Sequence, residues 1–188
     1  PTDCPQRDER QGWLGDRSEE SRGETYLFNL AAFCSKWVCD MEDAQKDNGS
    51  VSDVCPAYWP LYNDNVTWPS SFIIIPNMLY GQYADLSTLR EHYDGMKKWI
   101  EHMLGYETEG IIPKDNYGDW CVPPERQELI HSEDPARKTP GDFIATAYFC
   151  HDLNLMAKYA GLLEKPEDQK VFQEKAAAMR DAFNARFY

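Results

Sequence analysis

Residues 1–16 of this chain concentrate side chains that can do chemistry. They read Pro-Thr-Asp-Cys-Pro-Gln-Arg-Asp-Glu-Arg-Gln-Gly-Trp-Leu-Gly-Asp and include four acids, two arginines and a tryptophan. Proline at position 5 and glycines at positions 12 and 15 interrupt regular structure, so the segment is predicted to be a loop. Many charged loops simply face solvent, and that is the first interpretation to weigh.

Two features of this segment favour a binding site. Its charges are interleaved with Cys4 and Trp13, whose side chains prefer burial, and buried charges need a partner or a ligand. Carboxylates and arginines can hydrogen-bond ring hydroxyls, an indole can pack on a sugar ring, and an acid can protonate a leaving oxygen. A calcium site is an alternative for the acidic loop, but Arg7 and Arg10 inside the cluster disfavour it.

The segment from Asp3 to Asp16 resembles the signature of bacterial α-L-rhamnosidases of glycoside hydrolase family 78. That signature reads D-C-P-x-R-x-E-R-x-G-W-x-G-D, and every position of it is met here. The resemblance implies an inverting hydrolase that releases terminal α-L-rhamnose from plant-type glycosides or polysaccharides. It also implies a bacterial source and a barrel of six helical hairpins.

The resemblance implies that Glu9 is the general acid. A general acid working near neutral pH needs a raised pKa, and repulsion from the adjacent Asp8 can provide it if both side chains face the same way. Other positions that match the rhamnose-contacting residues of the family are Asp3 and Asp16 for hydroxyls, Arg7 as an orienting donor and Trp13 as an apolar wall. Asp8 and Arg10 are expected to be structural.

Two aromatic positions further along the chain also match the sugar pocket of the family. Trp68 matches best, because its spacing in the sequence from the acid is similar to that of a pocket tryptophan in the family, and Trp59 is the second choice. Aromatic residues in loops can also pack into the hydrophobic core, which is the competing interpretation. Trp120, in a Gly-Asp-Trp tripeptide, matches a second pocket tryptophan. Asp119 is a weaker candidate for substrate binding, because an aspartate after glycine also caps turns.

The second carboxylate of an inverting mechanism is expected outside this chain. It must lie about 6.5–9.5 Å from the acid, with water between the two groups. In the family it lies well downstream, and Asp53, Asp119 and Glu125 do not match it. The chain is therefore expected to be the N-terminal portion of a single catalytic domain, residues 1–188, with no second domain and no turnover by itself.

Composition supports a folded protein with an uncharged ligand. The 188 residues are 42% hydrophobic and 13% aromatic, with a net charge of −13. This charge disfavours nucleic acid and anionic membranes and fits a carbohydrate, and no cofactor is expected. Most of the six cysteines are interpreted as buried hydrophobes. A bond between Cys34 and Cys39 is disfavoured by their helical offset, whereas a disulfide from Cys55 to Cys121 stays open.

The compartment is left open by the sequence. The chain has no initiator methionine, signal peptide or apolar run long enough for a membrane span, and it is expected to be an excerpt of a longer protein. A periplasmic or secreted location is favoured, with a cytoplasmic one as the alternative.

Hydrophobic periodicity predicts five helices, over residues 23–46, 69–83, 86–104, 141–160 and 166–188. The first is predicted to bury one face, comprising Tyr26, Leu27, Leu30, Phe33, Cys34, Trp37, Val38 and Met41. A strand is the competing interpretation of the isoleucine run in 69–83. Asp85 is predicted to cap the third helix, Gly161 to end the fourth, and His151 to be a satisfied core histidine.

The predicted helices alternate in character, which indicates the fold class. Helices 69–83 and 141–160 are apolar on all faces, whereas helices 86–104 and 166–188 each have one polar, solvent-facing side. This difference is expected between the inner and the outer helices of a closed ring. We therefore predict an all-α protein comprising about half of an (α/α)6 barrel. An ordinary helical bundle is the alternative, disfavoured by the long loops between hairpins.

Two other functions remain open on the sequence alone. One is a non-catalytic carbohydrate-binding relative, which the intact signature with Glu9 disfavours. The other is an (α/α)6 hydrolase acting on a different α-L-sugar or on an unsaturated uronide.

Overall fold

The structure is a computed structural model that describes residues 8–119, 122–129 and 134–188. The predicted site residues Asp3, Arg7 and Trp120 lie outside the described residues. Regular structure is helical in the described part, where β-pairing is limited to isolated bridges. The α-helices are α1 (Leu14–Glu24), α2 (Ala31–Asp43), α3 (Ser71–Tyr83), α4 (Ser87–Leu104), α5 (Gly141–Leu162) and α6 (Pro166–Phe187).

Helix α3 occupies the centre of the packing. It contacts α1, α2, α4 and α5, and it buries residues on every face, including Phe72, Ile73, Ile75 and Leu79. The competing strand interpretation of the isoleucine run is therefore wrong. Pro76 is accommodated inside the helix, and Ala84 ends it in a left-handed conformation with φ of 53°.

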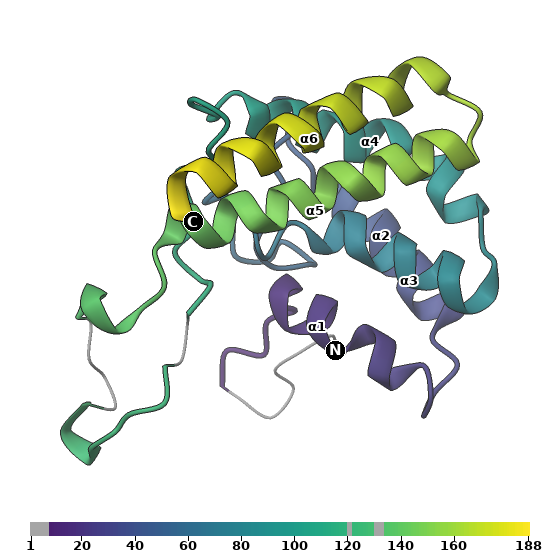
Figure 1. Cartoon of the computed structure of the whole chain (residues 1–188). Coiled ribbons are helices and arrows are strands. Elements are labelled where there is room, and N and C mark those ends of the chain that lie inside the picture. The colour runs from purple at the N-terminus through teal and green to yellow at the C-terminus, as the bar shows by residue number, and fades with distance from the viewer. Residues whose placement is uncertain (1–7, 120–121, 130–133) are drawn as a thin grey trace.

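The alternation of inner and outer helices is confirmed. Helix α5 packs against α3, α4 and α6, and Figure 1 shows α5 and α6 side by side as an antiparallel hairpin. Helix α4 buries one face through residues such as Leu89, Tyr93, Met96 and Ile100, while α6 buries Phe172, Ala176 and Met179. Helices α4 and α6, each with one solvent-facing side, therefore cover α3 and α5, which are enclosed on several sides.

The prediction of one helix over 23–46 is wrong. The chain instead ends α1 at Glu24, turns through residues 25–30 and starts α2 at Ala31. The N-cap of α2 is Leu30, and the side chain of Asn29 before it accepts a hydrogen bond from the Ala31 amide at 3.2 Å. Tyr26 and Leu27 therefore leave the predicted apolar face and are 85% and 76% exposed, and Phe33 is also exposed, whereas Leu30, Cys34, Trp37, Val38 and Met41 are buried.

Smaller differences concern the ends of helices. Helix α5 continues through Gly161 to Leu162, so that glycine does not end it. His151 is exposed on α5 and is not a core histidine. The prediction of Asp85 as the N-cap is wrong by one residue, because α4 begins at Ser87 and its N-cap is Leu86. From the position before the N-cap, the carboxylate of Asp85 accepts hydrogen bonds from the amide of Ser87 and the hydroxyl of Thr88 in the first turn.

The connection between α4 and α5 is long and largely irregular, as predicted. It contains two short 3₁₀ turns, Gln127–Leu129 and Pro135–Arg137, and most of its residues after 122 are exposed. Cys34, Cys39, Cys55 and Cys150 are free thiols, and Cys121, the other member of the pairing left open above, lies outside the described residues. In the part of the chain that is described, every helix is too short or too polar to cross a bilayer.

Candidate active site

The chemically rich segment is fixed against the loop that precedes α3. Trp13 forms an antiparallel bridge with Val54, and hydrogen bonds extend this pairing on both sides. The Leu14 amide donates to the Asp53 carbonyl at 3.0 Å, and the Cys55 amide donates to the Gly12 carbonyl at 2.8 Å. Residues 12–14 of the motif are therefore held against residues 53–55.

The last residues of the motif are helical, which corrects the prediction of a loop over the whole segment. Helix α1 begins at Leu14, so Gly15 and Asp16 lie in its first turn. An acidic side chain at this end of a helix interacts favourably with the helix dipole. Among the described residues of the motif, Glu9 lies in a turn, Trp13 lies in the bridge and Asp16 lies in the helix.

Glu9 is half-buried and interacts with another motif residue. Its Oε1 accepts a hydrogen bond from Nε1 of Trp13 at 3.2 Å, while the neighbouring Asp8 and Arg10 are exposed. The indole N–H can donate a hydrogen bond but cannot accept one. It therefore holds one carboxyl oxygen of Glu9 in place and cannot take up the proton that an acid carries. Glu9, the predicted general acid, and Trp13, the predicted apolar wall of the site, are therefore in contact.

Trp13 also belongs to a cluster of three aromatic rings, together with Tyr117 and Trp68. Tyr117 lies edge-on to Trp13 with ring centroids 6.3 Å apart and packs on Trp68 with centroids 4.7 Å apart. Trp68 is half-buried, whereas the fallback Trp59 is 38% exposed and lies in the loop before it. The structure therefore brings Glu9, Trp13 and Trp68 together through Tyr117, a residue that was not among the predicted site residues.

Asp115 holds the loop that carries Tyr117. Its Oδ1 accepts the amides of Tyr117 and Gly118 at 2.8 and 2.9 Å, and its Oδ2 accepts the amide and hydroxyl of Thr67 at 2.9 and 2.8 Å. Thr67 directly precedes Trp68 in the chain. One buried carboxylate therefore joins the two segments that present Tyr117 and Trp68.

Asp53 is a second buried carboxylate beside the cluster. Its Oδ2 accepts hydrogen bonds from the Tyr117 hydroxyl at 3.1 Å and the Asn63 amide at 2.6 Å. Burial raises the pKa of Asp53 to about 6, partly offset by these two hydrogen bonds. Since the side chain is fully enclosed, Asp53 is a support of the site and has no access to a ligand.

A cleft of about 520 Å³ opens beside Trp68. Asp16 and Glu19 of α1 line one side, and Tyr148 of α5 lines another, with the Tyr148 hydroxyl donating to Glu19. The other lining residues are Gly15, Ser18, Thr67, Trp68, Gly118 and Ile144. Carboxylates and aromatic rings around a hollow of this size suit a polar ring with apolar faces.

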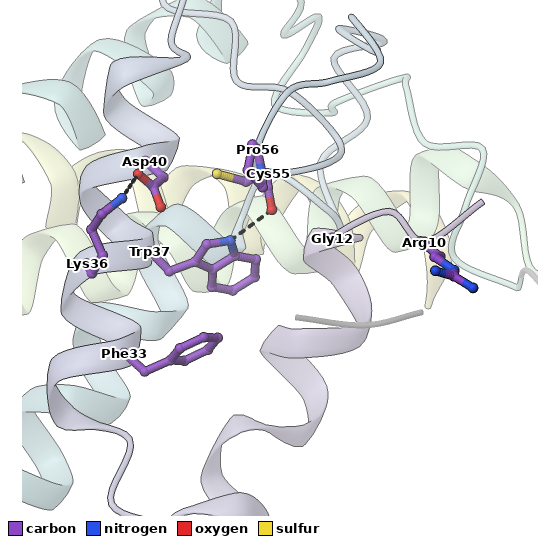
Figure 2. A pocket seen from close by; sticks show the side chains of 8 residues that line it. All are labelled: Arg10, Gly12, Phe33, Lys36, Trp37, Asp40, Cys55 and Pro56. Carbon is purple, nitrogen blue, oxygen red and sulfur yellow. Dashed lines mark hydrogen bonds and ion pairs between the residues drawn. The ribbon is translucent and has the colours of Figure 1, made fainter. Parts of the chain in front are cut away.

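A smaller hollow of about 230 Å³ lies on the other side of the motif segment, against α2. Figure 2 shows Trp37 donating its indole N–H to the Cys55 carbonyl, a bond of 3.1 Å, and the ion pair of Lys36 with Asp40. Arg10, Gly12, Phe33 and Pro56 complete its lining. The Trp37 bond ties the loop that pairs with Trp13 to α2.

Asp119 has a structural contact outside the cleft. Its carboxylate accepts a hydrogen bond from the backbone amide of Thr139, which lowers the pKa of Asp119. This contact closes the loop that leads into α5. Among the described residues, no group of three or more His, Cys, Asp or Glu side chains is arranged to hold a metal ion.

Sequence reasoning missed Tyr117, Asp115 and Gly15 as supports of this site. The first two lie in the segment that was examined for its Gly-Asp-Trp tripeptide, but nothing in their local pattern shows that they contact Thr67 and Trp68. Gly15 was treated as a turn residue, whereas it packs on an aromatic ring. These contacts join segments about 50 residues apart, which no local pattern encodes.

Gly15 offers a test of how closely the motif and Trp68 are packed. A Cβ at position 15 would lie 2.4 Å from the Trp68 ring, so Gly15→Ala must displace the indole or the start of α1. We expect a loss of about 1–3 kcal/mol in stability, typical of overpacking, and weaker ligand binding in the cleft. Gly23→Ala is the matched control, since a Cβ there meets nothing within 4 Å. Thermal unfolding of both variants measures the difference, and equal behaviour would contradict the packing.

Comparisons with known proteins identify the family of the chain. Residues 1–188 match the family model described as the bacterial alpha-L-rhamnosidase 6 hairpin glycosidase domain. An α-L-rhamnosidase of Formosa agariphila is 34% identical over the whole chain, and one of Streptomyces avermitilis is 33% identical. The chain spans 20% and 17% of the lengths of these two relatives.

Solved structures give the same result. The chain superimposes over its full length on an α-L-rhamnosidase from Dictyoglumus thermophilum with a TM-score of 0.88 and 39% identity, covering 20% of that chain. It matches the Streptomyces avermitilis α-L-rhamnosidase complexed with L-rhamnose with a TM-score of 0.87 and 33% identity, covering 17% of that chain. The fold is therefore all-α and part of an (α/α)6 barrel, as predicted, and the chain belongs to the bacterial α-L-rhamnosidase six-hairpin glycosidase family.

Proposed function

We propose that the full-length protein is an inverting glycoside hydrolase that releases terminal α-L-rhamnose, with this chain contributing the general acid. The observation that carries the proposal is the contact between Glu9 and Trp13, next to the cluster with Trp68. An acid used in glycoside cleavage must be held in one orientation beside a wall on which the sugar rests. The family membership of the whole chain supports the same reaction.

The roles follow from the chemistry of each group. Glu9 donates a proton to the leaving glycosidic oxygen, and the hydrogen bond from Trp13 restrains the orientation of its carboxyl group. The rhamnose ring lies in the cleft lined by Trp68, with hydroxyls directed at Asp16. A carboxylate from the rest of the protein activates the water that attacks the opposite face of the sugar.

Release of free L-rhamnose by the full-length protein tests this function. We expect release from an aryl α-L-rhamnoside and from rhamnosylated plant glycosides, with β-L-rhamnose as the first product seen by proton NMR. Retention of the α-configuration would contradict the inverting mechanism. Binding of rhamnose without release would identify a non-catalytic carbohydrate-binding protein, and release only from another α-L-sugar or an unsaturated uronide would identify a different hydrolase.

A further inference from the structure

We infer that Asp53 is a positioning residue that, through Tyr117, sets the orientation of Trp13 and Trp68 around the acid. The inference rests on the proposed function for its kinetic consequence. It concerns a buried side chain that matches no position of the family signature and that lies outside both described hollows.

The geometry excludes direct contact of Asp53 with substrate. The residue has no exposed surface, and its Oδ2 is engaged by the Tyr117 hydroxyl and the Asn63 amide. No described residue donates a hydrogen bond to its Oδ1. Burying a carboxylate with one oxygen unpaired costs free energy. The cost is understandable if the hydrogen bonds that Oδ2 accepts are needed to hold the site.

Asp53 is joined to both parts of the site. Its carbonyl accepts the amide of Leu14, where α1 begins, and its side chain holds the ring of Tyr117. The adjacent Val54 pairs with Trp13. A shift of this residue would therefore move the motif segment and the aromatic cluster together.

Tyr117 transmits the restraint because its backbone is already fixed. Asp115 accepts the Tyr117 amide at 2.8 Å, so rotation of the side chain is the main freedom that remains. The Tyr117 hydroxyl donates to Asp53 and accepts from the Asn63 amide at 3.2 Å, and both bonds restrict that rotation. The bond to Asp53 is the stronger restraint, because hydrogen bonds to a charged group are about twice as strong as neutral ones. The ring is thereby held against both tryptophans, one of which donates to Glu9.

The test uses Asp53→Asn, Tyr117→Phe and the double variant in the full-length protein. Misplacing an acid slows substrates that need a proton on the leaving oxygen more than activated ones. We expect kcat/KM on a natural rhamnoside to fall about 10-fold in each single variant, with a smaller loss on an activated aryl rhamnoside. Both changes break the bond between Tyr117 and Asp53, and each also alters a hydrogen bond of Asn63, so the loss in the double variant should be clearly smaller than the sum of the two single losses.

A matched control is available in a second tyrosine–aspartate pair, in which Asp64 is buried and Tyr106 is exposed. The Tyr106 hydroxyl donates to Oδ2 of Asp64 at 2.8 Å, and Tyr106 makes no described ring contact with the aromatic cluster. Tyr106→Phe removes the same kind of bond and should leave the ratio of the two rates unchanged. Equal losses on both substrates in the Asp53 variant, or wild-type kinetics, would overturn the inference.

A second measurement separates this inference from the proposed function. The near-ultraviolet circular dichroism of the full-length protein reports the packing of aromatic rings, whether or not any rhamnoside is cleaved. Asp53→Asn should change it in the same direction as Tyr117→Phe, with non-additive effects in the double variant. An inactive wild type with these spectral changes would refute the function and retain the positioning role, whereas unchanged spectra in Asp53→Asn would refute the positioning role.

Discussion

Replacing Glu9 by alanine in the full-length protein is expected to slow cleavage of a natural rhamnoside by about 10²–10⁴-fold, the usual contribution of a general acid. The loss on an aryl rhamnoside with a very good leaving group should be far smaller. The reason is that only a poor leaving group needs a proton as the bond breaks. Glu9 is placed for this role by its half-buried position and its bond to Trp13.

Steady-state kinetics on the two substrates measure this difference. Glu20→Ala is a suitable control, because Glu20 is an exposed carboxylate on α1 that does not line the cleft. It removes the same charge without touching the cluster and should leave both rates near their wild-type values. Equal losses on both substrates in Glu9→Ala would remove Glu9 from the role of proton donor.

Asp115→Ala is expected to destabilise the protein by about 3 kcal/mol or more. The substitution leaves the amides of Thr67, Tyr117 and Gly118 and the hydroxyl of Thr67 without their acceptor. Both donors of Thr67 are buried, and each unsatisfied buried donor costs about 1–3 kcal/mol. The costs do not add fully, because the loop can shift toward water. Urea unfolding of the full-length protein followed by tryptophan fluorescence measures the change.

Asp85→Ala provides the contrast for this prediction. Asp85 also accepts hydrogen bonds from a backbone amide and from hydroxyls, but it lies at the half-exposed start of α4, where water can replace it. A cap of this kind is worth about 0.5–2 kcal/mol. A loss in Asp115→Ala no larger than in Asp85→Ala would show that the Asp115 contacts do not hold the two segments together.

The helices were largely predictable because their signals are local. Period 3.6 in the hydrophobic residues located α3 to α6, and the contrast between all-round and one-sided apolar patterns separated inner from outer helices. The same method failed at residues 23–30, where Tyr26 and Leu27 continued the apolar period by chance. Asn29, whose side chain accepts the amide of the first residue of α2, was the local sign that a new helix starts there.

The site was predictable only in part. The signature in the sequence named Glu9, Trp13 and Asp16, and the family it resembles named Trp68; the structure then brings the first two into contact and lines the cleft with the others. Asp119 was predicted as a weak candidate for substrate binding, and its observed contact is with the backbone of Thr139. The roles of Asp3, Arg7 and Trp120 remain predictions.

The sequence by itself determined the family, the helical class and the identity of the proposed acid, because these depend on residue types at fixed short spacings. Only the tertiary structure decided how the site is supported. Asp53 and Asp115 act on residues 64 and 48 positions away in the chain, and Gly15 packs on a ring 53 positions away. Such contacts depend on how whole helices and loops pack, which no short stretch of sequence specifies.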